Sequence, residues 1–322
     1  MKAVVMERYG TPDVLELKDV PTPTPKANEV LVRVHAASIN DWDWGLLRGE
    51  PFVNRIFNGL VIPKVRIIGC DIAGRVEAVG EHVKSFRPGD EVHGDLSSSG
   101  FGAFAEHACV PETALAHKPS GMTFEQAAAI PHAGMLAVQG LIDVGRIQSG
   151  QKLLLNGAGG GVGTLALQLA KLHDVEVTVV DKPGKLEMLR AMGADHSIDY
   201  VEQDFTRAGK RYDLILDVKT NRSSFAYARA LNPDGAYVTV GGSIPRLLQT
   251  LVLGPFVSRL HHKHLRIVAL KPNKDLAYIN ELFEAGKLRP VIHGSYELAD
   301  LPEALRLFAS GDHQGKIIVT MT

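Results

Sequence analysis

The chain has 322 residues, enough for two domains, and its 45% hydrophobic and 22% charged residues are ordinary for a globular protein. Its 35 basic and 36 acidic side chains leave a net charge of -1, which argues against nucleic-acid binding through a global basic field. Two cysteines exclude a disulfide framework, and the apolar runs are too short for a signal peptide or a membrane span. We therefore expect a cytoplasmic protein.

Residues 1–125 have the residue pattern of a β-rich region. Short apolar runs recur between glycine, proline and asparagine positions, at 4–6, 15–17, 30–34, 74–80 and 87–92. Many short strands at such close intervals predict a partly open barrel.

From about residue 126 the pattern changes to alternating helices and strands. An alanine-rich helical stretch at 124–144, broken by Pro131 and Gly134, is followed by apolar runs at 152–156, 175–180, 213–217, 236–240 and 265–270. Apolar strands separated by helices are typical of a parallel sheet that is buried on both faces. Beyond residue 272 we expect helices at 276–286 and 301–310 and a closing strand at 315–320.

The strand at 152–156 runs into a glycine cluster and then into a helical pattern. The cluster fits the dinucleotide fingerprint as Ala158-x-Gly160-x-x-Gly163, and a register shifted to Gly157 also fits. Positions without side chains let the main chain approach a pyrophosphate, whose charge is favoured at a helix N-terminus. The alternative is a flexible turn. The predicted phosphate-binding residues are Ala158, Gly159, Gly160, Gly161, Val162 and Gly163.

An acidic residue ends the next strand, where a ribose-binding carboxylate is expected. Asp181 lies 18 residues beyond Gly163 and favours NADH. Lys182 and Lys185 follow it, and either could pair with the 2′-phosphate of NADPH. The residues themselves leave both cofactors open.

A mostly apolar stretch at 244–260 precedes the sequence His261-His262-Lys263-His264. The stretch could be an interface helix, a wall of the substrate pocket or a peripheral membrane contact, and we favour a buried or dimer-packing helix over lipid contact. Adjacent histidines cannot all face one metal ion, so we interpret the histidine cluster as a solvated turn.

Several motifs together resemble the medium-chain dehydrogenase/reductase superfamily, in its zinc-independent quinone oxidoreductase-like branch. The similar stretches run along nearly the whole chain and include 36–43, 69–74, 79–80, 86–92, 102–107, 157–163, 193–195 and 315–317. The resemblance implies an α/β protein with a GroES-like catalytic domain, formed by residues 1–125 and 272–322, and a Rossmann domain at 126–271 with a doubly wound parallel sheet. It also implies a homodimer in which the sheet extends across two Rossmann domains.

Metal ligands distinguish the branches of this superfamily. Zinc-dependent members carry a cysteine where Asn40 stands, Gly-His-Glu where Gly69-Cys70-Asp71 stands, and another cysteine near His132. A neutral asparagine is a poor zinc ligand, although the cysteine, aspartate and histidine could each bind a metal ion. We predict no metal, without excluding a rebuilt zinc site, and Cys70 has the alternative role of a small buried hydrophobe.

Without a metal, hydride transfer from a nicotinamide needs an activated acceptor, such as a quinone or an α,β-unsaturated carbonyl. The protein must then offer hydrogen bonds to the oxygen on which charge builds. Our pocket candidates are Asn40, Asp43, Trp44, Cys70, His132 and Lys316, of which Asn40, Trp44, Cys70 and His132 are the predicted catalytic residues.

The catalytic candidates have plain structural alternatives. Asn40, which the resemblance places beside the nicotinamide, could be a turn residue. Trp44 could stack on a quinone or form a packed lid. His132 could donate a proton or be a satisfied buried histidine. Some relatives carry a tyrosine where this chain has Gly45, which puts a tyrosine proton donor in doubt.

The resemblance favours NADPH as the cofactor. It places Tyr200 near the adenosine, Gly241 and Gly242 beside the nicotinamide, and Asp217 and Lys316 among the further cofactor-contacting residues. The function predicted is therefore NADPH-dependent reduction of a quinone or enone. The alternatives are a zinc-dependent alcohol dehydrogenase and a non-catalytic NADPH-binding protein.

Overall fold

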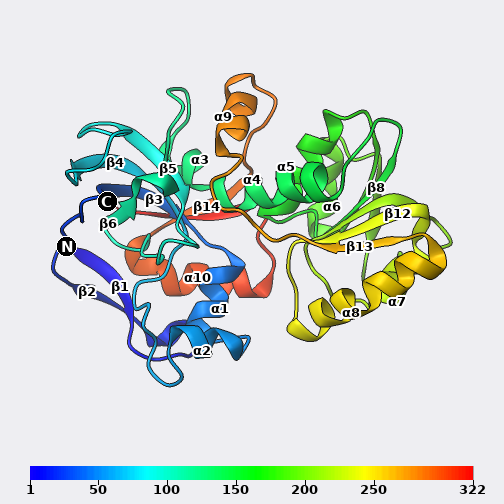
Figure 1. Ribbon diagram of the computed structural model, residues 1–322, viewed down its shortest axis with the longest axis horizontal. Coiled ribbons are helices and arrows are strands. Elements are labelled where there is room, and N and C mark those ends of the chain that lie inside the picture. Colours follow the sequence, from blue (N-terminus) through cyan, green and yellow to red (C-terminus); the bar gives the residue numbers. More distant parts are fainter. Residues whose placement is uncertain (322) are drawn as a thin grey trace. The chain divides into compact units, whose positions relative to one another are not determined.

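The computed structural model describes residues 1–321, without the side chains of residues 260 and 261. Its chain forms two compact units (Figure 1). The first unit comprises residues 1–133, 272–285 and those from 290 onward, and the second comprises residues 134–271 and 286–289. Both ends of the chain thus belong to one unit, and the middle of the chain forms the other.

Mostly antiparallel strands form the main sheet of the first unit, in the order β14-β15-β3-β4-β5-β7, with β6 also paired to β3. Only the pairing of β14 with β15 is parallel in the described part of this sheet. A separate hairpin pairs β1 (Lys2–Met6) with β2 (Leu15–Asp19). The main strands are β3 (Glu29–Ser38), β4 (Asp71–Val79), β5 (Glu91–Asp95), β6 (His107–Pro111), β7 (Ala116–His117), β14 (Ile292–Glu297) and β15 (Lys316–Thr320).

Register in this sheet brings distant residues together. In β15, Ile318 lies opposite Ser38 of β3, and Ser38 in turn lies opposite Asp71 of β4. Asp71 pairs on its other side with Asp95 of β5. Three neighbouring strands, β3, β4 and β5, therefore place the polar side chains of Ser38, Asp71 and Asp95 side by side at one end of the sheet.

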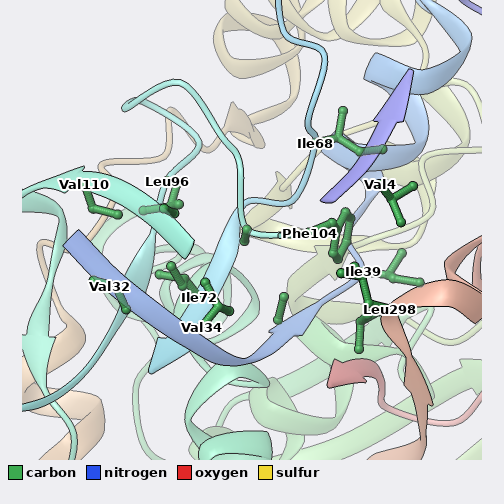
Figure 2. Close-up of a cluster of buried hydrophobic side chains, with 14 of the residues drawn as sticks. Val4, Val32, Val34, Ile39, Ile68, Ile72, Leu96, Phe104, Val110 and Leu298 are labelled. Atoms are coloured by element: carbon green, nitrogen blue, oxygen red, sulfur yellow. The ribbon is translucent and has the colours of Figure 1, made fainter. Parts of the chain in front are cut away.

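Helices and short turns complete the first unit. The helix α1 begins after Asn40, whose backbone and side chain form a capping box with Asp43, and ends at Gly49 with a left-handed φ of 61°. The helices are α1 (Asp41–Arg48), α2 (Val53–Asn58), α3 (Phe124–Ala128), α9 (Leu276–Glu284) and α10 (Leu301–Ser310), with single 3-10 turns at Pro12–Val14, Glu112–Ala114 and Leu298–Asp300. Apolar side chains from the sheet and these helices, including Val32, Ile72, Phe104 and Leu298, form the core (Figure 2).

Six parallel strands form the described sheet of the second unit, in the order β10-β9-β8-β11-β12-β13. The strand order reverses at β8, so the connecting helices lie on opposite faces, α5 and α6 on one and α7 and α8 on the other (Figure 1). The strands are β8 (Lys152–Asn156), β9 (Glu176–Asp181), β10 (His196–Asp199), β11 (Tyr212–Asp217), β12 (Leu231–Thr239) and β13 (His264–Ile267); the helices are α5 (Gly161–Lys171), α6 (Pro183–Ala191), α7 (Ser224–Arg229) and α8 (Ile244–His261).

The predicted fold class is confirmed: a doubly wound parallel sheet accompanies a β-rich unit that includes the C-terminal strand. Some local expectations differ from the structure. Gly134 does not interrupt α4 (Pro131–Val138), which continues into a π-helical segment over Gln139–Val144. The predicted domain boundary at residue 125 precedes α3, yet α3 contacts β3 and β4, and the first unit extends to Ala133.

Candidate functional site

A buried carboxylate, Asp71, gathers the polar side chains of the first unit. Its Oδ2 accepts hydrogen bonds from Ser38 Oγ at 2.7 Å and Asn40 Nδ2 at 2.9 Å, and Lys316 Nζ lies 3.2 Å away. Its Oδ1 accepts a bond from the backbone N–H of His132 at 2.9 Å. Asp71 is fully buried, so these donors replace the water that a charged carboxylate would otherwise need.

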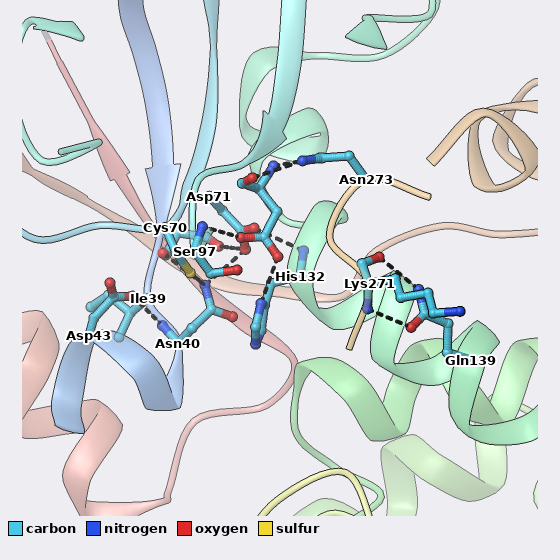
Figure 3. A network of polar contacts seen from close by, with 12 residues as sticks. Ile39, Asn40, Asp43, Cys70, Asp71, Ser97, His132, Gln139, Lys271 and Asn273 are labelled. Carbon is cyan, nitrogen blue, oxygen red and sulfur yellow. Dashed lines mark hydrogen bonds and ion pairs between the residues drawn. The ribbon is translucent and has the colours of Figure 1, made fainter. Parts of the chain in front are cut away.

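The Asn40 side chain lies inside this cluster, close to Cys70 and Asp71 (Figure 3). Besides donating to Asp71, its Nδ2 lies 3.1 Å from Cys70 Sγ, and its Oδ1 accepts a bond from Lys316 Nζ at 2.5 Å. Lys316 also donates to the carbonyl of Ile39 at 3.1 Å. The structure therefore brings Asn40, Cys70 and Lys316 together, as predicted from separate motifs, and fixes the Asn40 side chain from three directions.

His132 forms a second buried pair with a residue that the sequence did not reveal. Its Nδ1 lies 2.8 Å from Asp95 Oδ2, a distance at which the imidazole N–H donates to the carboxylate. Burial alone would lower the pKa of His132, but the hydrogen bond and the negative charge of Asp95 outweigh this and raise it. The pair thus favours a protonated imidazolium with its Nδ1 directed at Asp95.

Burial favours the neutral forms of Asp43 and Cys70. Asp43 accepts bonds from the backbone N–H groups of Asn40 at 2.8 Å and Gly69 at 3.0 Å. Burial nevertheless raises the pKa of Asp43 from 3.8 to about 7, and the charge of Asp71 adds to the rise. Burial, followed by the neighbouring carboxylates, also raises the pKa of the Cys70 thiol well above its ordinary value.

Three side chains of the cluster could hold a metal ion. Ligand atoms of Cys70, Asp95 and His132 all lie within 4.8 Å of one another, and the three residues are buried. Cysteine, carboxylate and imidazole are all zinc ligands, so the donor types fit. However, a cysteine binds as its thiolate, and the raised pKa of Cys70 opposes that form. In the described residues, the predicted histidine turn contributes no such group: His262 ends α8, and His261 lies outside the described side chains.

The remaining catalytic candidate, Trp44, is partly buried beside the core, with the Arg48 guanidinium 5.3 Å from the centre of its ring. At Gly45 a Cβ atom would lie 2.8 Å from the carbonyl oxygen of Glu50. A side chain at this position of α1 would therefore collide with the main chain at Glu50 unless that segment moved. The sequence did not single out Ser38 or Asp95, because only strand register brings them to Asp71.

In the second unit, the glycine loop joins β8 to α5 as predicted. Gly157 has a φ of 79°, and Gly160 precedes α5 in an extended conformation. A Cβ atom at Gly163 would lie 2.4 Å from Ala158 Cα, whereas at Gly160 it would meet nothing nearer than 4.0 Å. Gly163 is thus needed for packing between loop and helix, and Gly160 leaves open space at the helix N-terminus. This arrangement fits a bound pyrophosphate.

Asp181 lies against this loop, and its carboxylate already accepts hydrogen bonds from the main chain. Its Oδ2 accepts a bond from Gly159 N–H at 2.7 Å, and its Oδ1 accepts one from Lys182 N–H at 2.8 Å. The ammonium of buried Lys185 lies 3.9 Å from the same carboxylate. Tyr200 donates its backbone N–H to the Asp181 carbonyl at 3.4 Å, so the predicted adenosine-side residues do lie together.

The other predicted cofactor residues end β11 and follow β12. Asp217 is fully buried and accepts bonds from Asn156 Nδ2 and Tyr237 Oη, each at 2.8 Å. Gly241 faces open space, and its carbonyl accepts a bond from Thr220 Oγ1 at 2.5 Å. Asp217 therefore links β8, β11 and β12 through hydrogen bonds, whereas the space beside the main chain at Gly241 is open. Their roles toward a cofactor stay predictions.

Comparisons with known proteins bear on this geometry. Residues 26–120 match the family model described as an alcohol dehydrogenase GroES-like domain, and residues 192–319 match one described as a zinc-binding dehydrogenase. A chloroplastic quinone oxidoreductase from Triphysaria versicolor is 31% identical over 331 residues, covering 99% of this chain and 98% of that protein. The chain belongs to the medium-chain dehydrogenase/reductase superfamily, in its quinone oxidoreductase-like branch.

Other members of this superfamily show its range. A chloroplastic NADPH-dependent alkenal/one oxidoreductase from Arabidopsis thaliana is 31% identical, over 99% of this chain and 79% of that protein. The quinone oxidoreductase structure from Coxiella burnetii has a TM-score of 0.88 at 28% identity, covering 100% of this chain and 99% of that one. A structure named as an NAD-dependent alcohol dehydrogenase has a TM-score of 0.87 at 28% identity, covering both chains fully. This chain is an oxidoreductase of the NAD(P)H-dependent quinone and alkenal reductase kind.

Two glycine substitutions in this oxidoreductase should separate cofactor binding from folding. Gly160→Ala should leave the free energy of unfolding within about 0.5 kcal/mol of the wild type, since its Cβ meets open space. The same methyl group should weaken NAD(P)H binding at least tenfold by keeping the phosphates off the main chain. Gly163→Ala should instead cost about 1–3 kcal/mol of stability, because its Cβ overlaps Ala158. Urea unfolding and fluorescence titration measure the two effects; the reverse pattern would contradict this assignment.

Asp43 should make stability depend on pH in a definite direction. Between pH 4 and about 7 the folded chain keeps a proton on Asp43 that the unfolded chain has released, so the free energy of unfolding should fall as pH rises. Asp43→Asn should remove this contribution and flatten the curve through that window. Asp41→Asn, at an exposed position in the same helix, is the matched control. Parallel curves for wild type and Asp43→Asn, by urea unfolding at several pH values, would rule out the buried carboxyl as the cause.

Proposed function

We propose that this oxidoreductase uses NADPH to reduce a quinone or an α,β-unsaturated carbonyl without a catalytic metal. The observation that carries the proposal is the buried Asp95–His132 pair, which holds a proton within the cluster centred on Asp71. Two further observations support it: the glycine loop leaves open space at Gly160, and the superfamily consists of oxidoreductases.

Reduction of such an acceptor requires a hydride and a proton. NADPH, when bound, supplies the hydride. His132, as the imidazolium, supplies the proton from its Nε2 to the enolate or quinolate, giving the saturated carbonyl or the quinol. The Nδ1 proton stays on the imidazole throughout and is donated as a hydrogen bond to Asp95, which fixes the tautomer that remains after proton transfer and stabilises the imidazolium before it.

Asn40 and Lys316 act in this proposal by positioning rather than by direct transfer. The amide of Asn40 and the ammonium of Lys316 bind each other and share Asp71, whose other oxygen accepts the backbone N–H of His132. A shift in either side chain is therefore transmitted to the main chain of His132. Trp44 keeps its proposed role of stacking on a flat acceptor.

The surroundings of Asp181 support NADPH over NADH. A free carboxylate would repel a 2′-phosphate, but this one is neutralised by Lys185 and accepts two backbone N–H groups. Lys182 follows directly and offers a further positive charge to the phosphate. The printed name of the Arabidopsis relative, an NADPH-dependent enzyme, agrees with this choice.

The zinc-dependent alcohol dehydrogenase remains the second candidate because of one observation: Cys70, Asp95 and His132 present ligand atoms within 4.8 Å. The hydrogen bonds of the cluster favour the metal-free alternative. His132 Nδ1 already faces Asp95, and Cys70 Sγ faces the Asn40 amide.

The purified protein should oxidise NADPH in the presence of quinones and α,β-unsaturated aldehydes or ketones, more efficiently than NADH. It should hold fewer than about 0.1 metal ions per chain and keep its activity after treatment with a chelator. Stoichiometric zinc, with activity on alcohols that the chelator abolishes, would support the second candidate. NADPH binding without turnover of any acceptor would identify a non-catalytic protein.

The Asp95–His132 pair predicts the pH dependence of the reductase. Activity should decline as pH rises through the raised pKa of His132, because the donor loses its proton. Asp95→Asn removes the charge of Asp95, the main influence that raises the pKa of His132 against burial, so this decline should move to lower pH. His132→Gln should lower kcat by about 10²–10³-fold and abolish the decline. Steady-state rates across pH 5 to 9 test this, and an unmoved profile in Asp95→Asn would exclude the pair as proton donor.

A further inference from the structure

Two lysine side chains lie against the glycine loop of the second unit. A Cβ atom at Gly159 would lie 2.5 Å from Cδ of Lys185, and a Cβ atom at Gly157 would lie 2.7 Å from Cγ of Lys219. The lysines come from opposite neighbours of β8: Lys185 belongs to α6, which follows β9, and Lys219 follows β11. The sequence singled out Lys185 as a candidate cofactor contact, and the structure adds Lys219 beside the same loop.

The main chain at Lys219 is fixed by the buried carboxylate of Asp217. Asp217 Oδ1 accepts the backbone N–H of Lys219 at 3.1 Å and the side-chain N–H of Asn156 at 2.8 Å. The backbone N–H of Val218 donates to the carbonyl of Asn156 at 2.9 Å. Asn156 is the last residue of β8 and directly precedes the glycine loop. The same contacts therefore hold Lys219 and the start of the loop together.

The charge of Lys219 stays within reach of the loop. Lys219 is exposed, while its aliphatic carbons lie beside the main chain of Gly157. A lysine carries its ammonium, with three rotatable N–H donors, at the end of a flexible stem. Beyond the contact at Cγ, only Cδ and Cε separate the loop from that ammonium. An anion bound on the loop would therefore meet this positive charge.

The loop by itself supplies too little positive charge for a pyrophosphate. The N–H group of Gly159 already donates to Asp181, so a carboxylate occupies one of the loop's donors. The ammonium of Lys185 lies 3.9 Å from that carboxylate and compensates its charge. The N-terminus of α5 offers further N–H groups and about half a unit of positive charge, whereas a pyrophosphate is negative at each phosphate. A further cation beside the loop would balance the remaining charge.

We infer that Lys219 binds the pyrophosphate of the dinucleotide on the glycine loop. Its stem packs along Gly157, and its ammonium forms charge-assisted contacts with the phosphate oxygens. This role differs from that of Lys182, which is proposed for the 2′-phosphate. Because NADPH, NADH and ADP-ribose share the pyrophosphate, Lys219 contributes equally to the binding of all three. The inference rests on the proposed function, since it concerns the cofactor of that reductase.

Binding of the three ligands to the full chain, measured without any acceptor, tests this role. Lys219→Met keeps an unbranched side chain beside Gly157 but removes the charge. It should raise the dissociation constants of NADPH, NADH and ADP-ribose by one common factor of about tenfold, because a charge-assisted contact with phosphate is lost. Titration calorimetry measures all three, including ADP-ribose, which has no nicotinamide fluorescence.

Lys219→Arg and Lys210→Met are the matched controls. Arginine keeps the positive charge, so Lys219→Arg should bind each ligand within about threefold of the wild type. Lys210 is exposed and precedes β11, at the opposite edge of the parallel sheet from Lys219, so Lys210→Met should leave all three constants unchanged. Thermal unfolding should show the same midpoint for every variant, because both positions are exposed.

Salt distinguishes a contact between charges from a change in the shape of the loop. Binding of NADH to the wild type should weaken as salt rises from about 50 to 500 mM, since salt screens exposed charges. This dependence should be smaller in Lys219→Met and should return in Lys219→Arg. The same salt dependence in the wild type and Lys219→Met would show that the ammonium does not act on the ligand, and the inference would be wrong.

The pattern of losses in Lys219→Met decides which part of the cofactor the lysine contacts. A loss for NADPH alone would place Lys219 at the 2′-phosphate, and a loss for NADPH and NADH without ADP-ribose would place it at the nicotinamide half. Either result, or unchanged binding of all three, would overturn the pyrophosphate contact and leave the proposed function intact. A wild-type chain that binds neither NADPH nor NADH would instead contradict the proposed function, and this inference with it.

Discussion

The buried carboxylate of Asp71 is the constraint on which the cluster of the first unit depends. A charged group without access to water must have its oxygens satisfied by protein, and donors from β3, β15, α4 and the residue before α1 converge on it. Replacing any one donor would leave the others around an incompletely compensated charge. The same contacts hold Asn40, Lys316 and the main chain of His132 in place, so the geometry of the candidate site follows from the solvation of a single group.

Charge balance explains why this site retains protons. Asp43, Asp71 and Asp95 are all buried, and Asp71 and Asp95 are direct neighbours across two strands, yet Lys316 is the permanent cation of the cluster. Ionising every carboxylate would leave excess negative charge at low dielectric. The structure relieves this by keeping a proton on Asp43 up to about pH 7 and by favouring the imidazolium of His132. A reductase needs both a hydride and a proton, and this electrostatic arrangement provides for the second.

The sequence predicted the features that depend on neighbouring residues. The glycine loop and the strands of the parallel sheet are local patterns, and the structure contains them. We could predict that Asn40 and Lys316 belong to one site only because family motifs identified both residues, which are 276 positions apart in the sequence. No motif identified Asp95, because its position opposite Asp71 is set by strand register. Asp181 was interpreted as a ribose-binding carboxylate; in the structure it already accepts a hydrogen bond from the Gly159 N–H of the glycine loop.

Helix α8 shows where periodicity stops being informative. A helix that is apolar on both sides gives no one-sided pattern, so hydrophobicity alone cannot distinguish a buried helix from one whose outer face is exposed. Burial supplies the missing information: Thr250 and Val257 are buried, whereas Leu251 and Phe256 are each 65% exposed. The orientation of α8 on the sheet is set by tertiary packing, and that packing decides which of its apolar residues belong to the core.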